Sequence, residues 1–163
     1  MNVIEKSGLF KVICDENFFG LNELELSYYL YQQTEEDFSE YLQFVRKHFM
    51  EMYSAVLQGL FMAYSKNPKW DIWDEVTKTF SRMELRDYKA VHQYIGMPVI
   101  EIMRYKEKIL TGFSFYQGNR MSVEHGICAV FESCNLLLIS DNHFSEILRY
   151  WDYHDSFNIL KLG

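Results

Sequence analysis

The sequence of 163 residues is poor in the residues and segments that mark fibrous, exported or membrane-spanning proteins. Its 2 prolines and 8 glycines exclude collagen-like and low-complexity chains. No apolar run reaches the ~18 residues of a membrane-spanning helix. The N-terminal segment MNVIEKSGLF lacks the apolar centre of a secretory signal. We therefore expect a soluble globular protein that resides in the cytoplasm.

Cysteine is scarce as well. Cys14, Cys128 and Cys134 are odd in number and form no Cys-x-x-Cys pair. This pattern fits a reducing compartment better than a disulfide framework. Each cysteine lies in or beside an expected strand, so we interpret all three as small buried hydrophobic residues.

Motifs for catalysis and ligand binding are also missing. The sequence has no Gly-x-Ser-x-Gly nucleophile turn and no glycine-rich phosphate loop. His48 and His92 have no metal ligand four residues away along a helix, and the spacing of His143, His154 and Asp155 matches no specific metal geometry. We expect neither a metal site nor a cofactor.

Apolar residues, by contrast, are abundant. They make up 48% of the chain, and aromatic residues make up 17%. A folded chain of this length buries about 70% of the surface that its unfolded form exposes. The composition therefore predicts a substantial core, and the length predicts one domain, residues 1–163.

The first half of the chain shows a change from a period of two to a helical period. Alternation over 10–14 and 24–30 predicts two strands, and Phe18-Phe19-Gly20 predicts a turn between them. Thr34 and Asp37 form a capping box before a long apolar stripe that includes Val45 and Leu60. The stripe predicts one helix over 34–66, wide enough in its apolar face to form the centre of the core.

The second half begins with weaker helical patterns over 70–80 and 83–95, the second closed by Gly96 as a left-handed cap. Strand patterns follow over 99–105, 109–116, 126–131 and 136–140, and a short helix over 144–151. We predict an α+β fold in which an antiparallel sheet packs on one long amphipathic helix, with shorter helices.

Charge is distributed unevenly. The net charge is −7, and the excess lies in the first half. An acidic chain is repelled by nucleic acid and by anionic membranes, so we expect neither as a partner. The segment 12–45 contains no Lys or Arg but eight carboxylates: Asp15, Glu16, Glu23, Glu25, Glu35, Glu36, Asp37 and Glu40. They form either a solvated face with some helix stabilisation or a docking surface for a basic protein.

Residues 112–131, GFSFYQGNRMSVEHGICAVF, carry a family resemblance. Gly112, Phe115 and the Glu124-His125-Gly126 triplet resemble a strand, reversal and strand pattern of small bacterial immunity proteins. Those proteins belong to toxin systems that include contact-dependent growth inhibition. The interpretation we favour for the triplet is a turn in which Gly126 supplies a positive φ. Glu124 and His125 would face opposite sides of a strand, which argues against an acid–base pair.

The resemblance implies a cytosolic protein, not an enzyme, that binds and blocks a cognate toxin. The acidic segment adds that this toxin is basic, as a nuclease would be. Two alternatives stay open: a small enzyme that acts on a polar metabolite through Glu124 and His125, and an interaction module without a toxin partner.

Overall fold

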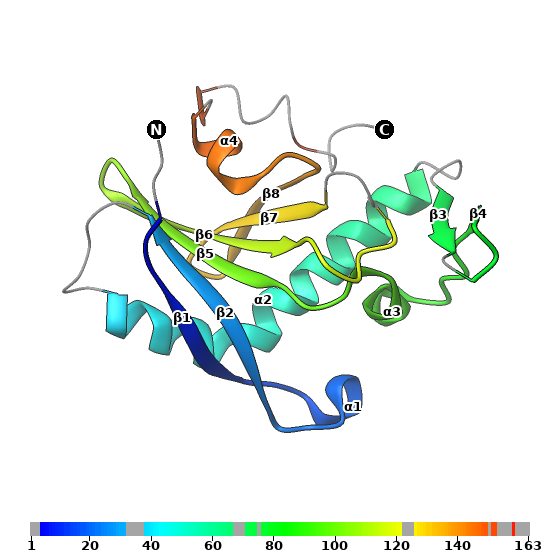
Figure 1. Cartoon of the computed structure of the whole chain (residues 1–163), viewed down its shortest axis with the longest axis horizontal. Coiled ribbons are helices and arrows are strands. Elements are labelled where there is room, and N and C mark those ends of the chain that lie inside the picture. The colour runs from blue at the N-terminus through cyan, green and yellow to red at the C-terminus, as the bar shows by residue number, and fades with distance from the viewer. Residues whose placement is uncertain are drawn as a thin grey trace.

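The computed structural model describes residues 4–31, 38–66, 71–74, 76–121, 126–149, 151–152 and 158. It has an α+β fold in which a long helix packs on a mostly antiparallel sheet (Figure 1). The elements in chain order are β1 (Ile4–Ile13), α1 (Glu16–Phe19), β2 (Glu23–Tyr31), α2 (Phe38–Lys66), β3 (Asp71–Asp74), β4 (Thr79–Arg82), the 3-10 turn η1 (Tyr88–Val91), α3 (His92–Ile95), β5 (Val99–Tyr105), β6 (Lys108–Phe115), β7 (Ile127–Glu132), β8 (Asn135–Ser140) and α4 (Phe144–Arg149).

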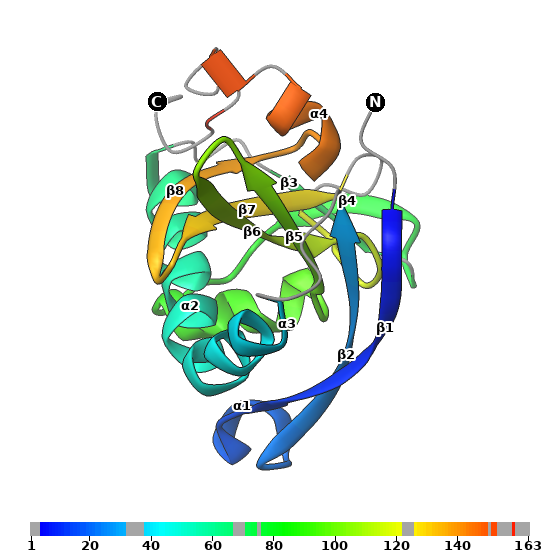
Figure 2. The ribbon, with the colours of Figure 1, turned by 90° about the vertical axis from the view of Figure 1, so that its left-hand side faces the viewer.

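Helix α2 is the central packing element, as its wide apolar face predicts. Val45, Phe49, Tyr53 and Leu60 recur at helical spacing and are fully buried against the sheet. Helix α4 covers the opposite face, where Phe144 and its neighbours pack on residues of β6, β7 and β8. Figure 2 shows the two helices on different sides of the strands. None of the helices in the described ranges is long and apolar enough to cross a membrane.

The large sheet has six strands in the order β1-β2-β5-β6-β7-β8. The predicted β1–β2 hairpin and the predicted antiparallel succession of β5 to β8 are confirmed. One pairing was not predicted: β2 and β5 run parallel, with Tyr28 opposite Ile100 and Tyr31 opposite Met103. A parallel pair requires a long crossover, and here residues 32–98, which include α2, provide it.

The predicted helix over 70–80 is wrong. Its described residues form the two-stranded sheet β3–β4, in which Trp73 pairs with Phe80. Asp74 promotes the turn because its side chain accepts hydrogen bonds from the backbone N–H groups of Val76 and Thr77, at 2.8 and 3.2 Å. Lys78 completes the turn with a φ of 54°.

The second weak helix, predicted over 83–95, is helical only in its last part. Asp87 begins η1, because its side chain accepts a hydrogen bond from the Ala90 backbone N–H at 3.2 Å, and α3 continues to Ile95. Gly96 has a positive φ of 71°, but its ψ of −157° differs from that of a left-handed helical cap. In the N-terminal hairpin, the predicted turn at 18–20 is one helical turn, α1.

Candidate functional site

The predicted acidic docking surface begins at the end of the β1–β2 hairpin. We call residues 11–25, which include α1, the hairpin tip; it projects away from the sheet (Figure 1). Asp15 caps α1, because its side chain accepts a hydrogen bond from the Asn17 backbone N–H at 2.8 Å. Glu16 follows in the first turn and is exposed. Asp15 therefore has a structural use, whereas the Glu16 carboxylate faces solvent.

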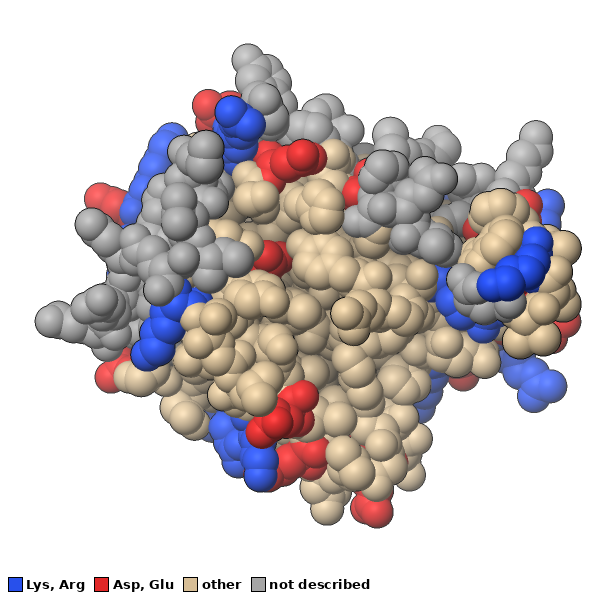
Figure 3. Space-filling view, in the orientation of Figure 1, with Lys and Arg blue, Asp and Glu red and all other residues tan. Residues whose placement is uncertain are grey.

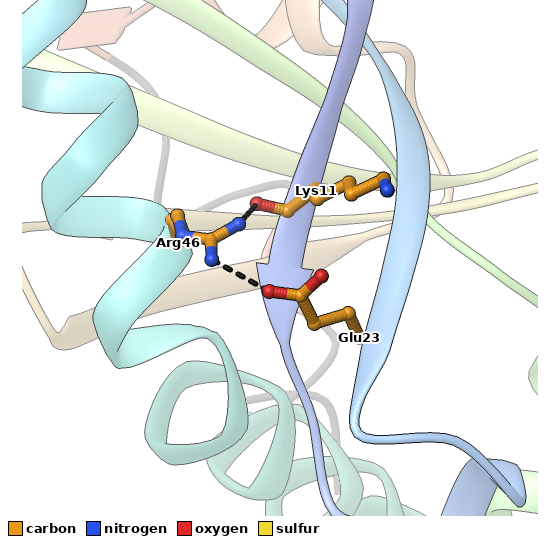
Figure 4. A network of polar contacts seen from close by, with 3 residues as sticks. All are labelled: Lys11, Glu23 and Arg46. Carbon is orange, nitrogen blue, oxygen red and sulfur yellow. Dashed lines mark hydrogen bonds and ion pairs between the residues drawn. The ribbon is translucent and has the colours of Figure 1, made fainter.

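Folding brings two basic side chains, Lys11 and Arg46, next to carboxylates of the acidic segment. Arg46 on α2 forms an ion pair with Glu23, with 2.6 Å between Nη2 and Oε1, and its Nη1 donates to the Lys11 carbonyl oxygen at 2.9 Å (Figure 4). Lys11 itself lies directly opposite Glu25 across the hairpin. These are the residues that flank the segment in sequence, so pairing of β1 with β2 and docking on α2 reduce its charge.

The other predicted carboxylates do not belong to the hairpin. Glu40 is exposed in the first turn of α2. Glu35, Glu36 and Asp37 lie outside the described residues, as does the predicted capping box that contains Asp37. The structure thus brings Asp15, Glu16, Glu23 and Glu25 together on one projecting element and leaves Glu40 on another.

The hairpin tip also exposes large apolar side chains, which the sequence did not single out. Ile13 is 47% exposed and Leu21 is 51% exposed, and Leu9 extends this strip along β1 at 62%. Ile13 lies opposite Glu23. In Figure 3 carboxylates lie among uncharged side chains, with basic side chains beside them, at the lower end of the molecule, where Figure 1 places the hairpin tip. Contiguous apolar patches with a polar rim mark protein interaction surfaces, whereas single exposed apolar side chains are common on any surface.

A half-buried histidine joins the hairpin tip to the rest of the fold. His92 Nε2 lies 2.9 Å from the Phe18 carbonyl oxygen, and Nδ1 lies 2.5 Å from the Tyr53 hydroxyl. Because a carbonyl only accepts, Nε2 carries the proton and Nδ1 accepts from Tyr53. Burial lowers the pKa of His92, an effect that the Phe18 hydrogen bond partly opposes. The tip is therefore held to α2 and α3 by a neutral imidazole.

A buried carboxylate network lies on the α4 side of the sheet, and sequence reasoning missed it. Glu101 on β5 is only 3% exposed. Its Oε1 accepts from the Tyr31 hydroxyl at 2.5 Å, and its Oε2 accepts from the hydroxyls of Ser114 and, at 3.2 Å, Tyr116. Burial and the nearby Glu101 raise the pKa of both tyrosines, so their hydroxyls stay protonated as donors. Three donors occupy the carboxylate, which suits a structural role.

The Glu-His-Gly motif is described only in part. Gly126 has the predicted positive φ, at 74°, and a Cβ there would lie 2.7 Å from the Phe115 carbonyl oxygen. Gly112 lets α4 approach the sheet, because a Cβ would lie 2.5 Å from Cδ1 of Phe144. Glu124 and His125 lie outside the described residues. The described part of the motif therefore serves backbone geometry and packing.

An open pocket of about 630 Å³ lies beside the turn between β5 and β6, lined by Tyr105, Lys106, Glu107, Lys108, Trp151 and Asp152. Among the described residues, none of the predicted site residues lines it. Comparisons of the chain with protein-family models, with curated proteins and with solved structures find no match.

Proposed function

We propose that this protein is an immunity protein that binds a cognate bacterial toxin in the cytosol and blocks it by occlusion. The proposal assigns the hairpin tip as the main contact surface. The observation that supports it most is the combination of exposed Ile13 and Leu21 with the carboxylates of Glu16, Glu23 and Glu25 on one projecting element.

The two kinds of side chain have different tasks in the proposed complex. Carboxylates attract a basic toxin over a distance and raise the association rate, especially at low ionic strength. Apolar side chains at the centre of the contact lose water on binding and slow dissociation. A basic toxin, as a nuclease would be, supplies the opposite charge, and its cleft is covered by the bulk of the hairpin.

The carboxylates of the tip do not contribute equally. Glu23 already pairs with Arg46, and Asp15 caps α1. Glu16 and Glu25 are both exposed, although Glu25 has Lys11 opposite it on β1. We expect Glu16 to contribute most to steering and Glu23 least.

Association kinetics with toxins encoded beside this chain test the proposal. The variant Glu16→Gln with Glu25→Gln should associate several-fold more slowly at low salt, and ~1 M salt, where the Debye length is about 3 Å, should remove the difference. The control variant, Glu84→Gln with Glu107→Gln, changes the net charge equally at exposed positions outside the tip. Equal rates for both variants would show that only the net charge acts.

A second variant separates the electrostatic effect on the association rate from the effect of apolar contacts on the dissociation rate. Ile13→Ser with Leu21→Ser should leave association nearly unchanged and accelerate dissociation by at least about 10-fold, as expected when apolar anchors at the centre of a contact are lost. Growth rescue is the broader test. If the wild-type chain protects cells from none of the toxins encoded beside it, the immunity proposal is wrong.

A further inference from the structure

Three metal-ligating side chains meet where α2 passes the turn between β7 and β8. His48 and Glu51 lie on α2, and Cys134 lies on the turn. His48 Nδ1 is 3.2 Å from Glu51 Oε2, and Cys134 Sγ is 3.6 Å from the same oxygen. All three ligand atoms lie within 4.8 Å of one another.

Helix α2 positions His48 and Glu51, and the turn between β7 and β8 positions Cys134. Positions three apart on a helix share one face, which brings His48 and Glu51 together. The Phe44 ring packs against the His48 ring at 4.5 Å between centroids. On the other side, the Tyr41 hydroxyl accepts from Thr111 at 2.9 Å and hydrogen-bonds to the Ser133 backbone, which ties the turn to α2 next to Cys134.

We propose that His48, Glu51 and Cys134 bind a zinc ion, with water as the fourth ligand. Tetrahedral zinc with bonds of ~2.0 Å to nitrogen and oxygen and ~2.3 Å to sulfur places neighbouring ligand atoms about 3.3 to 3.6 Å apart. The His48–Glu51 contact of 3.2 Å is slightly shorter than this range, and the Cys134–Glu51 contact of 3.6 Å lies at its upper end. Sulfur and imidazole nitrogen select zinc over magnesium and calcium, which prefer oxygen ligands alone.

Binding requires one proton transfer and a small movement of side chains. In the structure the Cys134 thiol donates to the Glu51 carboxylate. Zinc binds the thiolate, so the S–H bond breaks, the Zn–S bond forms and the proton passes to solvent. Glu51 is 65% exposed in its side chain and is free to adjust.

The site is independent of the proposed toxin contact, because none of its residues belongs to the hairpin tip. It also changes the sequence-based expectation of no metal site. That expectation considered ligands four residues from His48 along a helix, where Met52 stands. The additional ligands are Glu51, three residues away, and Cys134, which pairing of β7 with β8 brings to the helix.

Cobalt substitution of the reduced, full-length chain tests the site directly. Co²⁺ should produce the sulfur-to-cobalt charge-transfer band and the intense visible bands of tetrahedral cobalt, and one equivalent of Zn²⁺ should abolish them. Cys134→Ser should remove the charge-transfer band, and His48→Gln should weaken binding by more than about 10-fold, since even outer-shell changes cost that much. Cys14→Ala, at a thiol elsewhere in the fold, should retain both bands.

A thermal measurement gives a second, independent result. Zinc at about 100 times its dissociation constant should raise the melting temperature of the wild type by roughly 5 to 10 °C and that of Cys134→Ser far less. Tetrahedral cobalt bands that are absent from the wild type, or that persist unchanged in Cys134→Ser, would overturn the proposal.

Discussion

Glu101 offers the sharpest test of how β2, β5 and β6 are held together. Its carboxylate is buried with neutral hydroxyls as hydrogen-bond donors, from Tyr31, Ser114 and Tyr116. Two contributions to the free energy of unfolding oppose each other at Glu101. Burial of the charge costs several kcal/mol, whereas each hydrogen bond to a charged group contributes about 1.5 to 3 kcal/mol.

The stability change expected for Glu101→Leu depends on which hydroxyl groups lose their hydrogen-bond acceptor. Glu101→Leu removes the charge but leaves the Tyr31 and Ser114 hydroxyls buried without their acceptor, at about 1 to 3 kcal/mol each. We expect a net loss of about 2 to 4 kcal/mol in the free energy of unfolding. Tyr31→Phe alone should cost about 1.5 to 3 kcal/mol, because one donor to a charged acceptor is lost.

The double variant separates these effects. In the Glu101→Leu background, the Tyr31 hydroxyl has already lost its acceptor, so Tyr31→Phe should leave the free energy of unfolding unchanged or raise it slightly. The coupling energy between the two changes should therefore be about 2 kcal/mol. Urea unfolding of the four proteins, with unchanged m-values, measures it. A coupling below about 0.5 kcal/mol would refute the network as a stabilising unit, because it would show that the hydroxyls find other partners.

Three further changes test other parts of the fold. Leu60→Ala should cost about 2 to 4 kcal/mol in denaturant unfolding as a buried large-to-small change, and a loss under about 0.5 kcal/mol would contradict the central place of α2. Because the native state lowers the pKa of His92 from its ordinary 6.5, it binds fewer protons than the unfolded chain. Stability should therefore fall as the pH drops below 6.5 towards that lowered value, and His92→Gln should flatten this slope in thermal melts from about pH 8 to about pH 5; an unaltered slope would assign the acid sensitivity to other groups. Gly112→Ala should cost about 1 to 3 kcal/mol, because the new methyl group meets the Phe144 ring; a neutral result in the same unfolding assay would mean that α4 moves freely.

The sequence predicts those elements whose pattern is set by local burial. Alternation over 24–30 and the long stripe of α2 both persist because one face of each element meets the core. The sequence predicts a helix over 70–80 because the large apolar residues of this segment recur every three to four positions, as on a helix. In the structure Val76 is 91% exposed and Phe80 is 66% exposed, so these two residues of the stripe face solvent and carry no packing signal.

The candidate sites depend on pairings that no local pattern contains. Tyr31 reaches Glu101 only because β2 runs parallel to β5, and Cys134 reaches His48 only because the turn between β7 and β8 meets α2. The acidic segment was found from the sequence, but the ion pair of Glu23 with Arg46 and the position of Lys11 opposite Glu25 were not. Glu101, the single carboxylate in the largely apolar strand 99–105, was the one available signal for the buried network.

The parallel pairing of β2 with β5 has a consequence for the order in which the chain folds. The contacts of β5 to β8 and of the β1–β2 hairpin join neighbours in sequence, so each unit closes short loops. The hairpin and the β5–β8 unit pair only after residues 32–98 close a long loop. Closing a long loop costs more entropy than closing a short one, so we expect the pairing of β2 with β5 to be slow. Strand β1 is an edge of the large sheet, so we expect its amide hydrogens to exchange faster than those of the central strands β5 and β6. A toxin that binds the hairpin tip would therefore contact an edge of the sheet, where local opening costs less free energy than at the centre.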